Sequence, residues 1–168
     1  MAFSKIIAES MDLTDTYAFT GTVTGAGENN TPIVFAQANS GTNCANATAT
    51  KITLDNEIVD TNNLFSSSRF TVTSTTQGKY LIVWQVSFNL STDGKSLQGY
   101  IKKNGTTIAA SEGGAHKSGN QTCIQRTSVI TNLVTDDYIE FFGRHDHGDT
   151  RANNGDIYTQ AAIILLAS

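Results

Sequence analysis

The chain has 168 residues, a formal net charge of −4 at pH 7 and only 15% charged residues, whereas almost a third of its residues are Thr, Ser or Asn. This length suits one domain with a single core. Thr favours strands and Ser and Asn favour turns, so the composition indicates an all-β protein and excludes a coiled coil. The acidic balance offers no basic excess for phosphates or anionic lipids, so neither nucleic acid nor a membrane is an expected partner.

The first 27 residues differ from the rest, and we expect an N-terminal arm at 1–27 and one domain at 28–168. Tyr17, Phe19 and Val23 alternate with small or polar residues, which is the period-two pattern of a strand. A segment this short cannot bury its own apolar side chains, so it either packs back onto the domain or binds another molecule. We interpret it as an attachment arm, with Phe3, Ile6, Ile7, Met11, Tyr17 and Phe19 as its contact residues.

From residue 31 onward the sequence predicts short strands separated by polar loops, a pattern typical of a sandwich or barrel. The expected strands are 33–38, 51–59, 69–75, 79–90, 97–103, 106–110, 122–133, 138–144 and 156–166. Asn104-Gly105 accepts the positive φ angles of a two-residue type I′ turn, so this pair predicts a hairpin with Ile101 opposite Ile108.

Two of these strands, 79–90 and 156–166, are apolar on both faces. An antiparallel sandwich needs only one dry face, so the surplus predicts that identical copies of the chain cover the other face. The expected interface residues are Tyr80, Leu81, Ile82, Val83, Trp84, Ile163 and Leu165.

Several short motifs occur in a fixed order between residues 52 and 166. They are Ile52-Thr53-Leu54-Asp55-Asn56, Arg69-Phe70-Thr71-Val72, Gly78-Lys79-Tyr80-Leu81-Ile82, Lys103-Asn104-Gly105, Ser128-Val129-Ile130-Thr131-Asn132-Leu133 and the apolar last strand. In this order they resemble the jelly roll of the complement globular-head proteins and the tumour necrosis factor (TNF) ligands. The sequence departs from that pattern at Asp136-Asp137, where the family has Gly-Asp, and at residues 160–163, which replace an aromatic-Gly-aromatic signature. The resemblance implies a TNF-like jelly-roll β-sandwich that assembles as a homotrimer.

The segment from Tyr17 to Gly27 resembles parts of the structural proteins of tailed bacteriophages. The N-terminal residues also lack the apolar centre of a secretory signal. We therefore expect a non-enzymatic virion protein that is assembled in the host cytoplasm. Our first hypothesis is a capsid decoration (cement) protein, anchored by its arm to the major capsid protein or another virion protein. The alternative is a tail-fibre or receptor-binding tip protein that recognises host surface glycans with its loops.

The only cluster of ligand-type residues in the sequence is His145-Asp146-His147-Gly148-Asp149. In an extended segment His145 and His147 would point the same way, and three copies around an axis would present six ring nitrogens to a metal. A solvated loop is the simpler interpretation, so we expect no metal and no cofactor. Cys44 and Cys123 are expected to be reduced thiols, and no catalytic residue is expected because no nucleophile has a suitably spaced base.

Overall fold

The computed structural model describes residues 32–114 and 119–168, and the predicted arm at 1–27 lies outside this part. The described residues form thirteen strands and no helix, so none of them belongs to a helix that could cross a membrane. All strand pairs are antiparallel. The predicted all-β class is therefore confirmed.

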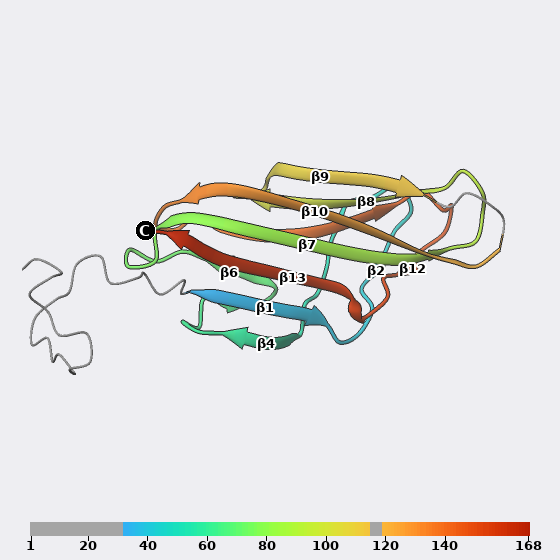
Figure 1. Cartoon of the computed structure of the whole chain (residues 1–168). Coiled ribbons are helices and arrows are strands. Elements are labelled where there is room, and N and C mark those ends of the chain that lie inside the picture. The colour runs from blue at the N-terminus through green and yellow to red at the C-terminus, as the bar shows by residue number, and fades with distance from the viewer. Residues whose placement is uncertain (1–31, 115–118) are drawn as a thin grey trace, which may run out of the picture.

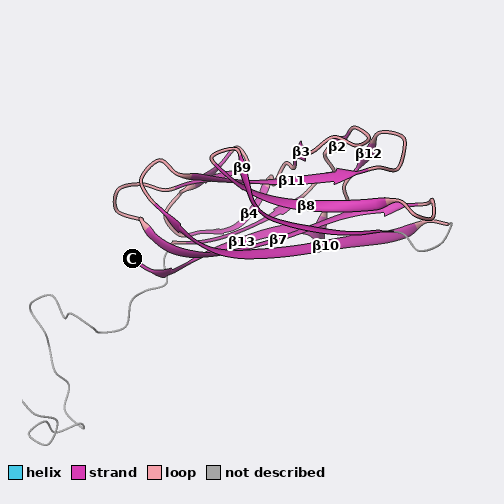
Figure 2. Ribbon diagram, turned by 90° about the horizontal axis from the view of Figure 1, so that it is seen from above, coloured by secondary structure: helices cyan, strands magenta, loops and turns pink. Residues whose placement is uncertain are grey.

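The strands form two sheets that pack face to face. Figure 2 shows β8 and β11 in one layer and β7, β10 and β13 in the other. The five-stranded sheet contains, in spatial order, β10 (Gln121–Leu133), β7 (Gly78–Leu90), β13 (Asp156–Ala167), β1 (Ile33–Ala38) and β4 (Asn56–Asp60). The six-stranded sheet contains β5 (Phe65–Ser66), β6 (Arg69–Thr71), β11 (Tyr138–His145), β8 (Ser96–Lys103) and β9 (Thr106–Gly114), with β3 (Thr50–Lys51) also paired to β11. A small ladder joins β2 (Asn43–Cys44) to β12 (Arg151–Ala152).

Aromatic side chains from both sheets fill the space between the layers. The Trp84 ring lies 5.0 Å from the Phe141 ring, and Phe70 meets Tyr80 edge-to-face at 5.4 Å. The indole N–H of Trp84 donates to the Phe142 carbonyl at 3.1 Å, so the only polar atom of this buried side chain has a partner. Each large side chain buried in this way contributes about 1.5–3 kcal/mol to folding.

The predicted strand at 51–59 is wrong, because the chain changes layers within it. Its first part, β3, pairs with β11 in the six-stranded sheet, and its last part, β4, pairs with β1 in the five-stranded sheet. Between the two, the Leu54 N–H donates to the Ser68 hydroxyl at 2.8 Å instead of to a neighbouring strand. The single predicted strand therefore spans two elements that belong to different sheets.

The predicted hairpin between β8 and β9 forms, but with a different register. Asn104 and Gly105 have φ angles of 51° and 80°, as a type I′ turn requires. Ile101 lies opposite Ala109 and not opposite Ile108, because a bulge adds one residue to β9. As a result, Ile108 and Ala109 both pack against the core.

Candidate interaction surface

Successive residues of β7 and β13 point to opposite sides of the five-stranded sheet. Most of the predicted interface residues lie on the inner side, so their side chains are buried in the core and out of reach of another subunit. These residues are Tyr80, Ile82, Trp84, Ile163 and Leu165. Leu81 and Val83 alternate with them on β7 and point outward, with Val83 37% exposed. The predicted interface set therefore contains residues from both faces of β7, and only Leu81 and Val83 are on the outer face.

Strand register places outward apolar side chains beside one another in two rows. One row joins Ile33, Ile164, Leu81 and Ile130 across four neighbouring strands. The second row joins Val59, Phe35, Ala162 and Val83. Neighbouring residues in such rows have their Cβ atoms about 4.5–5.5 Å apart. We call these eight residues the apolar face.

Every residue of the apolar face is partly or fully accessible to solvent, and Ile130 is 59% exposed. The alternation within each strand could have identified the outward residues Phe35 and Ile164. Which strands lie beside each other is not visible in local patterns, so sequence reasoning missed the continuity from β4 to β10.

A polar row runs beside the apolar face across the same strands. Gln37 donates to Gln160 at 3.0 Å, and Gln85 donates to the carbonyls of Ile157 and Tyr158 at 2.8 and 3.1 Å. The Arg126 guanidinium donates to the Gln85 side-chain oxygen at 2.6 Å. Because these amides already have partners within one chain, covering the row costs less than burying free amides would.

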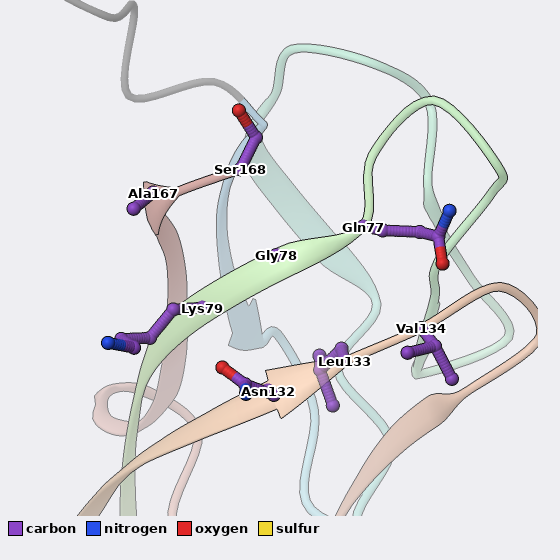
Figure 3. A pocket seen from close by; sticks show the side chains of 8 residues that line it. All are labelled: Gln77, Gly78, Lys79, Asn132, Leu133, Val134, Ala167 and Ser168. Carbon is purple, nitrogen blue, oxygen red and sulfur yellow. The ribbon is translucent and has the colours of Figure 1, made fainter.

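A groove of about 380 Å³ lies at one end of the five-stranded sheet, and we call it the end groove. It is lined by residues 77–79, 132–134 and 167–168. Figure 3 shows the start of β7 between the end of β10 and the end of β13. A Cβ atom on Gly78 would lie 2.3 Å from the Ala167 carbonyl oxygen, so only glycine allows β13 to approach β7 this closely.

The two candidate metal ligands do not share an open site. His145 is buried beside the Phe88 ring, and its Nε2–H donates to the Cys44 carbonyl at 3.0 Å. Its Nδ1 accepts the His147 N–H at 3.3 Å. The His147 Nδ1–H donates to Asp149 at 3.0 Å, and its Nε2 accepts the Ser91 N–H at 3.2 Å. All four ring nitrogens are therefore bonded within the chain, and the described residues include no group of three metal-ligating side chains.

The two cysteines are free thiols. Burial raises the pKa of Cys44 to about 11, although a hydrogen bond with Thr50 acts in the opposite direction. Burial also raises the pKa of Cys123. Both thiols are therefore protonated at neutral pH, which is unfavourable for nucleophilic chemistry.

The outer face of the six-stranded sheet carries paired charges. Glu140 accepts from Lys51 at 2.9 Å and from Arg69 at 2.7 Å. Burial raises the pKa of Glu140, but the hydrogen bonds from Lys51 and Arg69 outweigh burial and hold the pKa below its ordinary value. On the same face the Lys102 ammonium lies 4.1 Å from the centre of the Phe142 ring. Charged side chains of this kind are typical of a solvent-exposed face.

Neither a protein-family model nor a curated protein matches this sequence. Solved structures do match. The structure of Eiger TNF from S. frugiperda superposes with a TM-score of 0.62 at 11% identity, covering 81% of this chain and 92% of that chain. The globular domain of zebrafish complement 1qA gives 0.59 at 14% identity, covering 80% and 97%. Murine APRIL gives 0.61 at 13% identity, covering 80% and 98%.

The fold is a TNF-like jelly roll. The predicted fold class is thus confirmed by structural likeness to both groups that the sequence motifs resemble. The two departures at residues 136–137 and 160–163 are compatible with the fold: Asp136 adopts a φ of 67°, a conformation that glycine usually supplies, and residues 160–163 remain paired with β7. Identities of 11–14% show the fold alone.

Proposed function

We propose that this chain is a non-enzymatic structural protein that assembles as a homotrimer through the apolar face. The observation that carries the proposal is the continuity of that face across β10, β7, β13, β1 and β4. The inner side of the same sheet already supplies the core, so folding does not require a second apolar side. Contiguous exposed apolar surface of this kind is typical of an interface.

Three copies are proposed because the sequence motifs resemble families that assemble as homotrimers. The composition of the face supports self-association: its two rows contain no charge, and the adjacent polar row is largely satisfied within one chain. Covering a surface of this kind has a small desolvation cost, because few polar groups lose water. It contributes about 25 cal/mol of favourable free energy for each Å² of apolar area buried.

We further propose that the trimer belongs to a bacteriophage virion, where it decorates the capsid. The likeness of residues 17–27 to tailed-phage structural proteins supports this location. The arm at 1–27 would bind the major capsid protein or another virion protein. Three linked arms raise the local concentration of one another, so individually weak contacts produce lasting attachment.

Sedimentation of the full chain at micromolar concentration tests the assembly. We expect a species of three times 18.0 kDa. Val83→Asp and Ile130→Asp place a charge in the apolar face and should give folded monomers, as judged by circular dichroism. Thr107→Asp, at an exposed position of the six-stranded sheet, is the matched control and should remain trimeric. A wild-type chain that sediments as a monomer would contradict the proposal.

Deleting residues 1–27 tests the arm. The shortened chain should remain a trimer and lose binding to particles, measured by co-sedimentation with virions that lack the protein. Undiminished particle binding would remove the arm from the proposed function.

A second candidate function is a tail-fibre or receptor-binding tip that holds host surface glycans. One observation favours it: a shallow groove of about 160 Å³ opens on the six-stranded sheet, between Gln98, Tyr100 and Glu112. An aromatic ring flanked by an amide and a carboxylate suits a polyhydroxylated ring, and assembly through the apolar face leaves this groove open. Labelling on particles separates the two functions, because decoration requires many copies over the head and a tip requires few on the tail.

A further inference from the structure

The end groove lies where the described chain begins. Ile33 of β1 is opposite Ile164 of β13, and the Leu165 N–H donates to the Pro32 carbonyl at 3.1 Å. β13 ends at Ala167, which lines the groove. Figure 1 shows the start of β1, the start of β7 and the C-terminus at the same end of the sandwich. Pro32, the first described residue, therefore lies near the strand end that lines this groove.

The groove has one well-exposed apolar side chain, Val134, beside a strand start that leaves room for large side chains. Leu133 is buried in the structure, whereas Val134 is 56% exposed. Gly78 contributes no side chain between them and Ala167, as Figure 3 shows. A volume of about 380 Å³ is at the lower end of the range for small-molecule sites, which is enough for one or two aromatic rings.

The arm contains matching side chains within reach. Tyr17 and Phe19 share one side of an alternating segment. Twelve residues lie between Phe19 and Pro32, and an extended chain over that separation spans roughly 40 Å. Attachment to the same domain also gives the segment an effective concentration on the order of millimolar, so a modest contact suffices to hold it.

We propose that the end groove is the docking site for residues 17–23 of the same chain, with the rings of Tyr17 and Phe19 packed against Val134 and over the backbone of Gly78. The inference deepens the proposed function and rests on it in one respect, the destination of the first sixteen residues. Docking at 17–23 divides the arm: its second half is held on the domain, and its first half, with Phe3, Ile6, Ile7 and Met11, is left to bind the virion protein.

Photo-cross-linking in the full-length chain tests the docking. Phe19→p-benzoylphenylalanine should cross-link to residues 77–79, 132–134 or 167–168 of its own chain, mapped by mass spectrometry. Thr20→p-benzoylphenylalanine is the matched control on the other side of the segment and should give at least fivefold less cross-linking to these residues. Adding Val134→Asp should lower the Phe19 cross-link at least fivefold, whereas Ile157→Asp, at an exposed apolar position outside the groove, should not.

Cross-links to other parts of the domain, or equal yields from positions 19 and 20, would overturn the proposal. A cross-linked band of twice the chain mass would also overturn it, because the segment would then dock on a neighbouring subunit. The same samples are sedimented before irradiation. Loss of the groove cross-link with the trimer intact counts against docking alone, whereas a groove cross-link in a monomeric chain supports docking and counts against the proposed assembly.

Discussion

The outer faces of the two sheets differ, although both sheets contribute inner faces to one core. The six-stranded sheet presents Glu140 with two cations, together with stacked cation–ring pairs. The five-stranded sheet presents two apolar rows and a polar row whose one charge is Arg126, with Lys79 near the start of β7, beyond the apolar rows. The jelly roll itself requires neither pattern. In the proposed assembly, this difference assigns the six-stranded sheet to solvent and the five-stranded sheet to the contact with another copy.

The largest expected effect contrasts the two sides of β7. Trp84→Ala removes a fully buried side chain that contacts Phe141, and we expect the free energy of unfolding to fall by about 3–5 kcal/mol. Val83→Ala, one residue away, should cost the subunit less than about 1 kcal/mol and act mainly on assembly. Urea denaturation and sedimentation of both variants measure the contrast. Equal losses of stability would show that the outer side of β7 is part of the core.

A smaller effect is expected on the charged face. Glu140→Gln leaves Lys51 and Arg69 without their shared carboxylate, and because both cations are partly exposed we expect a loss of about 1 kcal/mol in unfolding free energy. The trimer should persist, since Glu140 lies on the sheet opposite the apolar face. Dissociation of this variant would mean that the charged face contributes to assembly.

Acidification should destabilise the fold by protonating two carboxylates, Asp137 and Glu140. Burial raises the pKa of Asp137, but hydrogen bonds from Lys103, the Val134 N–H and Asn104 lower it by a larger amount. The net pKa shift is therefore downward, as it is for Glu140. A carboxylate whose folded pKa is depressed contributes stability above its unfolded pKa of about 4 and loses it as pH falls through the folded value. The urea midpoint should therefore fall below pH 4, and less so in Glu140→Gln and Asp137→Asn. A parallel fall in all three chains would exclude these carboxylates as the cause.

The smallest effect concerns the thiols, which probe the core without disturbing it. With a pKa of about 11, buried Cys44 should react with iodoacetamide at pH 8 only after unfolding. The half-buried Cys123, on the edge strand β10, should react sooner, yet more slowly than a free thiol. Peptide mass spectrometry over time gives both rates. Faster labelling of Cys44 would show that the β2 end of the sandwich opens.

Parts of this architecture were predictable because they depend on local patterns. Alternation over residues 79–90 separates Tyr80 and Trp84 from Leu81 and Val83, and Asn104-Gly105 specifies its turn. The apolar face was not predictable as a surface, because its rows join Ile33, Leu81, Ile130 and Ile164, which are distant in sequence. Pairing at that separation is decided by global packing.

Two further differences between the predicted and the observed structure also arise from partners that are distant in sequence. The segment at 51–59 was predicted as one strand but crosses between layers before β4. Ser68 supplies a side-chain acceptor for the Leu54 N–H, where a strand would need a backbone partner. The buried position of His145 depends on the Cys44 carbonyl, a hundred residues earlier in the chain. Local spacing in the His145–Asp149 cluster contains no information about that partner.

The hydrogen-bonded row of Gln37, Gln160, Gln85 and Arg126 has a kinetic consequence. Because partners within one chain already hold the Gln85 and Arg126 side chains, their conformational entropy is lost during folding and would not be lost again on forming the proposed trimer. Encounter between subunits then needs little rotamer searching beside the apolar rows. Such preorganisation favours slow dissociation, so mixed trimers should form slowly when two differently labelled populations are combined.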